Sequence, residues 1–304
     1  MTGFVLLAML SGVCFAIIGV MMRLGQSKNV VPLHISMCMG LAGAIYFGFQ
    51  IDWANWDVPA YVIIMALCGT TGLIASMIFT KMSLKRGPLS PLWTATNLTF
   101  IVVTVYAALM FAEKIGLMQG LALLFGIVCV IFAANLGDMP KSDGKDDKKP
   151  LKMKVEYALL LFLVLVGNSF SFLVIKDLGT RLMPDTATPY IVLYRPHMYF
   201  IMYLSMALVS FIIVKFIDKS KPVSYKWVWG LGALAAAGSI SGMVMLSSVV
   251  DKLPASVVFT LNSICCILVG CIISVLAFKE KIKPAWWGTI VFGIVAVILA
   301  NIVL

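Results

Sequence analysis

Residues 125–133 read FGIVCVIFA and residues 292–300 read FGIVAVILA, so seven of the nine positions are identical. Upstream of each segment, FAEKI at 111–115 recurs as FKEKI at 278–282. The two matches occur in the same order and at the same offset, which composition alone does not produce. The chain therefore contains two copies of one unit.

The chain is far more apolar than a water-soluble protein. Of its 304 residues, 62% are hydrophobic and 12% are charged, whereas soluble proteins carry about 25% charged residues. This composition excludes a soluble enzyme, a nucleic-acid-binding domain and a disordered chain. We therefore expect the net charge of +10 to come from basic loops beside anionic lipid, and no nucleic-acid partner.

The apolar residues gather in ten runs, each close to the ~20 residues that cross a bilayer core of ~30 Å. The runs fall at about 2–22, 31–49, 58–80, 89–111, 115–134, 155–175, 190–214, 226–250, 254–278 and 284–304. We predict an all-α membrane protein of ten transmembrane helices.

A charged linker divides these ten runs into two equal groups. Residues 135–154 contain GDMPKSDGKDDKKPLKMK, and they separate a first five-helix repeat at 1–134 from a second at 155–304. Because five is an odd number, the second repeat enters the membrane inverted relative to the first. Inverted repeats are typical of secondary transporters with a site near the membrane midplane.

The same segments resemble a known family. The stretch MSLKRGPLS at 82–90 precedes a span, the FAEKI segment and a glycine-containing span, and Pro88-Leu89-Ser90 pairs with Pro254-Ala255-Ser256 in the second copy. This order resembles an EamA-type member of the drug/metabolite transporter superfamily. The resemblance implies a transporter rather than an enzyme, in the cytoplasmic membrane of a bacterium or archaeon, with no cofactor. Family members move amino acids, nucleotide sugars, phosphorylated sugars, choline and other small metabolites.

Polar and aromatic residues share one helical face at matching positions of the two copies. Trp93, Asn97 and Phe100 follow the i, i+4, i+7 spacing, and the repeat offset leads to Phe259 and Ser263. Such faces suit a midplane cavity, although interhelical packing uses the same residue types. The predicted substrate-binding residues are Trp93, Asn97, Phe100, Asn168, Arg195, Tyr199, Phe259, Asn262 and Ser263.

Arg195 is the basic residue within a predicted span, near the start of the run 190–214. A guanidinium can bind a carboxylate or phosphate in bidentate fashion, so we expect an amino acid or a related anionic or zwitterionic substrate. The alternative is an interfacial arginine that reaches the lipid headgroups.

The two histidines, His34 and His197, each lie within two residues of a proline. They are candidates for a proton relay, and the alternative is a pair of hydrogen-bonded interfacial histidines. No third ligand accompanies them, so no metal site is predicted. We expect no acidic residue in the interior of a span, which leaves uniport, exchange or histidine-mediated proton coupling open.

Two further questions stay open at the level of sequence. Most lysines and arginines fall in loops on the side opposite the termini, which predicts a cytoplasmic linker and external termini, whereas EamA-type relatives are drawn with cytoplasmic termini. The same scaffold also fits a flippase or a channel-like pore, as a monomer or a homodimer in the bilayer.

Overall fold

A computed structural model of the chain describes residues 2–84, 92, 95–134, 151–184, 186–218, 224–278 and 284–302. Trp93, most of the linker and residues 279–282 of the FKEKI segment lie outside these residues. The described residues form helices and turns and contain no named β-strand.

Long apolar helices make up almost the whole described structure, because a helix satisfies its own backbone hydrogen bonds in lipid. The helices are α1 (Thr2–Ser27), α2 (Pro32–Gly48), α3 (Ala60–Leu84), α5 (Thr99–Phe111), α6 (Leu117–Ala134), α7 (Leu151–Thr180), α8 (Tyr190–Ile212), α9 (Tyr225–Ser247), α10 (Ala255–Phe278) and α11 (Pro284–Ile302). A 3₁₀ turn, η1 (Trp53–Asn55), follows α2, and a π-helical turn, η2 (Ile213–Asp218), extends α8.

Six of these helices are long and apolar enough to cross a membrane. The candidate spans are Thr2–Gly25, Ala60–Ser83, Val155–Thr180, Tyr190–Ile217, Tyr225–Ser247 and Ala255–Ile273. The shorter apolar helices are Pro32–Gly48, Ala95–Phe111, Leu117–Phe132 and Ile290–Ala300. The all-helical, multi-pass membrane fold is therefore confirmed, while ten crossings in an inverted repeat stay a prediction.

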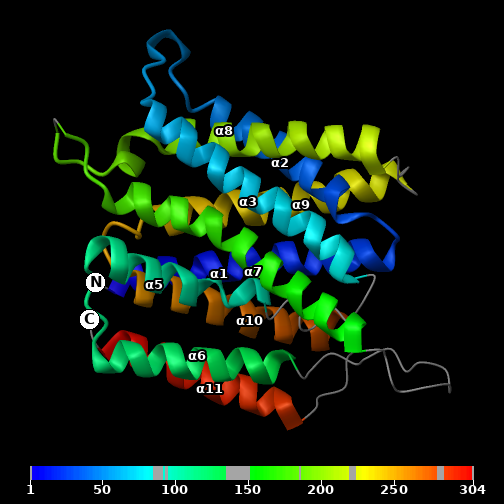
Figure 1. The fold of residues 1–304 in the computed structure, drawn as a ribbon, viewed down its shortest axis with the longest axis vertical. Coiled ribbons are helices and arrows are strands. Elements are labelled where there is room, and N and C mark those ends of the chain that lie inside the picture. Colours follow the sequence, from blue (N-terminus) through cyan, green and yellow to red (C-terminus); the bar gives the residue numbers. More distant parts are fainter. Residues whose placement is uncertain are drawn as a thin grey trace.

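Prolines mark where several helices begin. Pro32 and Pro284 are the first residues of α2 and α11, and Pro59, Pro189 and Pro254 immediately precede α3, α8 and α10. Proline suits this position because the first amides of a helix have no partner within it. These turns bring the chain back on itself, so that both termini lie at the same side of the bundle (Figure 1).

The two halves of the chain interleave rather than forming separate bundles. α3 packs along α7 and α1 along α9, while α2 packs on α8 and α6 on α11. Each of these extensive contacts joins a helix of the first half to one of the second. In Figure 1, α2 and α8 lie toward one end of the long axis and α6 and α11 at the other.

Glycines allow the closest of these helix crossings. A methyl group at Gly72 of α3 would lie 2.6 Å from the Gly167 carbonyl oxygen of α7, and one at Gly238 of α9 would lie 2.6 Å from the Cys14 carbonyl oxygen of α1. Side chains larger than hydrogen would push these backbones apart. The pair Gly238 and Gly242 thus packs directly on α1.

Exposed aromatic residues mark both ends of the bundle. Trp53 and Trp56 lie between α2 and α3, and Tyr225, Trp227 and Trp229 lie at the start of α9. Tryptophan and tyrosine concentrate at the two membrane–water interfaces. The side with Trp53 and Trp56, which also carries the termini, is called the terminus side below.

Candidate functional site

The C-terminal turn of α7 carries a buried carboxylate, that of Asp177. The apolar run predicted for this span ends at residue 175, but α7 continues to Thr180 and the candidate span Val155–Thr180 includes Asp177. Only 1% of Asp177 is exposed. Asp177 thus lies just beyond the predicted run, in the last turn of the candidate span, where neighbouring groups compensate its charge.

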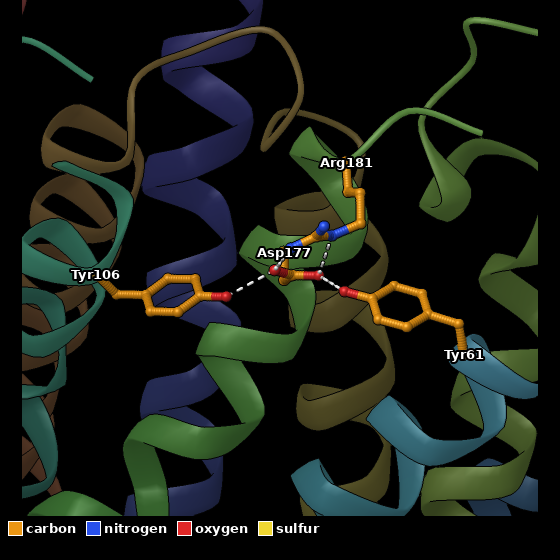
Figure 2. A network of polar contacts seen from close by, with 4 residues as sticks. All are labelled: Tyr61, Tyr106, Asp177 and Arg181. Carbon is orange, nitrogen blue, oxygen red and sulfur yellow. Dashed lines mark hydrogen bonds and ion pairs between the residues drawn. The ribbon is translucent and has the colours of Figure 1, made fainter. Parts of the chain in front are cut away.

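Asp177 accepts hydrogen bonds from three residues (Figure 2). The Tyr106 hydroxyl of α5 donates to Oδ1 at 2.6 Å, and the Tyr61 hydroxyl of α3 donates to Oδ2 from the opposite side. One turn along α7, Nη2 and Nε of Arg181 each lie 3.3 Å from a carboxylate oxygen. A charge so enclosed needs such partners, since an unpaired buried carboxylate is strongly unfavourable.

This hydrogen-bond network also joins the two halves of the chain. Tyr61 and Tyr106 belong to the first half, and Asp177 belongs to the second. Arg181 is 45% exposed, and the adjacent carboxylate raises its pKa further above the ordinary value. Arg181 therefore stays charged and neutralises Asp177 from the solvent side.

A second buried ion pair lies one residue away on α7. The Lys176 ammonium, 2% exposed, contacts Oε1 of Glu113. Glu113 follows the C-cap residue of α5, Ala112, which is in the left-handed conformation with φ of 52°. Its other oxygen, Oε2, accepts a hydrogen bond of 2.9 Å from the backbone amide of Ala255, the first residue of α10. A carboxylate is favourable there, because the helix N-terminus is its positive end.

A cavity of about 300 Å³ opens beside this ion pair on the terminus side. It lies among the turn after α5, the end of α7 and the connection between α9 and α10. Its lining residues are Glu113, Lys176, Gly179, Thr180, Leu182, Pro189, Val250, Asp251, Lys252, Leu253 and Pro254. Asp251 is 6% exposed and pairs with Lys252 at 2.7 Å, whereas Lys252 is half exposed. The cavity thus carries two charges of each sign.

Several residues predicted from sequence gather elsewhere, where α1, α5, α7 and α10 meet. Asn168 Nδ2 donates to the Thr96 carbonyl and the Thr99 hydroxyl, both at 3.1 Å. One turn along α7, Phe172 lies edge-on to Phe259 with 5.8 Å between ring centroids.

The remaining members of this group are also buried. Asn262 accepts a 2.8 Å hydrogen bond from Ser11 of α1. Asn97, Phe100 and Ser263 have little exposed surface. These contacts join the helices. Substrate binding by these residues stays a prediction.

Arg195 and Tyr199 do not join this group, because they lie on α8 against α9. Arg195 Nη2 is 3.4 Å from the Ser247 carbonyl oxygen, and the Tyr199 hydroxyl donates to the Met243 carbonyl at 3.1 Å. His197 lies edge-on to Trp56, with 5.2 Å between centroids, and His34 is buried in α2. Trp93 lies outside the described residues.

The described candidates therefore form two groups, and none of them lines the charged cavity. Two features of the sequence could have indicated that cavity. A Lys-Asp pair followed by Arg181 closes an apolar run, and the glutamate of FAEKI recurs in FKEKI. No group of three or more His, Cys, Asp or Glu side chains within the described ranges could hold a metal ion.

Fold and site together define a multi-pass helical membrane protein with a cluster of ion pairs on its terminus side. The model of the EamA-like transporter family matches residues 2–135, which confirms the family resemblance seen in the sequence. A solved crystal structure of a protein aligns with a TM-score of 0.70, covering 97% of this chain and 96% of its own, at 13% identity. That similarity concerns the fold alone. No curated protein matches the chain.

Proposed function

We propose that the chain transports a small polar organic metabolite by alternating access between two inverted five-helix repeats. The substrate class is an amino acid or a related anionic or zwitterionic solute. The EamA-like match supports transport in general, and the packing of the two halves supports the mechanism.

The observation that carries the proposal is the reciprocity of helix packing. If α1, α2 and α3 correspond to α7, α8 and α9, the contact of α3 with α7 has its counterpart in that of α1 with α9. The contact of α2 with α9 likewise has its counterpart in that of α3 with α8. The pairs α2–α8, α5–α10 and α6–α11 each join a helix to its own counterpart. Such a pattern is expected of two repeats related by a pseudo-twofold axis.

A related argument concerns the terminus side, where the halves are tied by charged groups. Asp177 is bound by Tyr61 and Tyr106, and Glu113 is bound by Lys176 and the start of α10. In this proposal these contacts hold the terminus side together in one state. They break when the helices rock to admit substrate from that side.

The test is solute counterflow into proteoliposomes. Vesicles are preloaded with a candidate amino acid, and entry of the labelled form is measured over concentration. An alternating-access carrier gives saturable uptake that is accelerated by unlabelled solute inside. A pore gives unsaturable flux without acceleration, and a flippase moves fluorescent phospholipid between leaflets instead; either result would replace this proposal.

A further inference from the structure

Among the residues that the structure describes, the Lys176 ammonium contacts fewer acceptors than it has N–H donors. A lysine carries three N–H donors, and within the described part of the chain its recorded partner is Oε1 of Glu113. At 2% exposure, bulk water does not readily supply the rest. Lys176 lines the cavity, so the unused donors have a place where an acceptor can enter.

Two other groups in the cavity are also available to a ligand. The Thr180 hydroxyl is buried and makes no hydrogen bond among the residues that the structure describes. The Asp251 side chain is 6% exposed, whereas its counterion, Lys252, is half exposed. The cavity therefore offers a cation and a hydroxyl for a carboxylate, and an anion for an ammonium group.

We propose that this cavity binds a small zwitterion of the α-amino-acid class, with its carboxylate on Lys176 and its ammonium group near Asp251. Glu113 occupies the place of the carboxylate when the site is empty. The inference rests on the proposed function and names the residues that hold its substrate. A volume of about 300 Å³ lies at the small end of ligand sites, which suits an amino acid better than a nucleotide sugar.

Displacement of Glu113 by the ligand leaves no bare charge behind. Its Oε2 already accepts the Ala255 amide, and the N-terminus of α10 stabilises the negative charge. The ligand carboxylate replaces Oε1 at Lys176, so the ammonium keeps an anionic partner throughout. Binding thereby loosens the link that Glu113 makes between α7 and the first half.

A ligand site and a structural ion pair predict different results for the two partners. In a structural pair, removing either charge is harmful in the same way. In the proposed site, Glu113 competes with the ligand while Lys176 binds it. Glu113→Gln keeps an acceptor for the Ala255 amide and removes the competing charge, so it should bind ligand more tightly.

The experiment is equilibrium dialysis of the purified full chain in detergent. The twenty protein amino acids are tested singly, with propionate and propylamine as single-charge controls. We expect one or more amino acids to bind, and Glu113→Gln to strengthen that binding several-fold. Lys176→Met should weaken it about tenfold or more, since a hydrogen-bonded charge is lost. Asp251→Asn should weaken amino-acid binding and leave propionate binding unchanged.

Two controls keep the test informative. Lys215→Met removes an exposed lysine of η2 and should bind as the wild type does. If Lys176→Met fails to fold, the double variant Lys176→Met/Glu113→Gln removes both charges, which folded proteins tolerate better than a half pair. This double variant should fold and lose amino-acid binding.

The inference is overturned if no amino acid binds, or if Glu113→Gln and Lys176→Met weaken binding equally. Counterflow separates it from the proposed function. Binding with the expected variant pattern but without transport refutes only the function. Saturable transport with a KM unchanged by Lys176→Met refutes only the site.

Discussion

At the scale of single residues, Asp177 is held by charged and polar contacts with three other side chains. Its carboxylate meets hydroxyls from two helices of the first half and the guanidinium one turn along its own helix. Charge-assisted hydrogen bonds of this kind are stronger than neutral ones. Asp177 is thus a connection between the halves as well as a buried acid.

Asp177→Asn should lower stability, because an amide is a weaker acceptor than a carboxylate and leaves Arg181 without its counterion. We expect a loss of about 2 kcal/mol, with a smaller loss of about 1 kcal/mol for Tyr61→Phe or Tyr106→Phe. Melting temperatures in detergent, measured at one scan rate, rank the three variants by their loss of stability. Tyr225→Phe, at an exposed position on α9, is the matched control. Equal melting temperatures for Asp177→Asn and the control would contradict the role assigned to Asp177.

The same substitution should open the terminus side. Thr180 lines the cavity, so a single cysteine placed there in a cysteine-free background reports access by a maleimide reagent. We expect faster labelling in Asp177→Asn than with Asp177 intact, because two links between the halves are weakened. An unchanged labelling rate would mean that Asp177 does not hold this side closed.

Arg195 gives a further prediction at this scale. If Arg195 contacts substrate, Arg195→Ala should reduce transport in proteoliposomes and leave the folded yield close to wild type. If it only packs against the Ser247 carbonyl, the folded yield should fall instead. Size-exclusion profiles and uptake on the same preparations separate the two results.

At the scale of elements, the fit between α3 and α7 depends on glycine. Gly72→Ala places a methyl group against the Gly167 carbonyl oxygen and Phe170, so it should destabilise the protein by about 1–3 kcal/mol. Gly230→Ala in α9 meets nothing within 4 Å, and alanine is the better helix former. The melting temperature should fall for the first variant and hold or rise for the second. A fall for Gly230→Ala as well would indicate a general intolerance of helix substitution.

Helix positions could be predicted from sequence far better than the site. Hydropathy predicted the apolar segments closely, because membrane helices need uninterrupted apolar runs. The predicted run 155–175 is shorter than α7 at its end, since Lys176 and Asp177 interrupt the apolar sequence. Their partners on other elements keep this turn buried. Those partners, Glu113, Tyr61 and Tyr106, are distant in sequence. The cavity likewise forms where the turn after α5, the end of α7 and the connection between α9 and α10 meet. The sequence of one segment does not predict that meeting.

At the scale of the whole molecule, the distribution of basic loops predicts orientation. The lysine-rich linker should lie in the cytoplasm and both termini outside. In intact cells, an impermeant thiol reagent should label a single cysteine at the C-terminus and spare one at Ser142. The reverse pattern would show that the arrangement drawn for EamA-type relatives applies.

The interleaving of the halves has a consequence for how the chain is made. During synthesis the first half enters the membrane before its partners α7, α8 and α9 exist. Its polar groups, which include those of Tyr61, Tyr106 and Glu113, then lack the contacts that they make in the folded protein. Assembly is then a late event between two inserted halves, and the linker keeps their local concentration high. If the gene is cut within the linker, the two coexpressed fragments should assemble into an active protein only at high expression levels, and each fragment alone should be degraded.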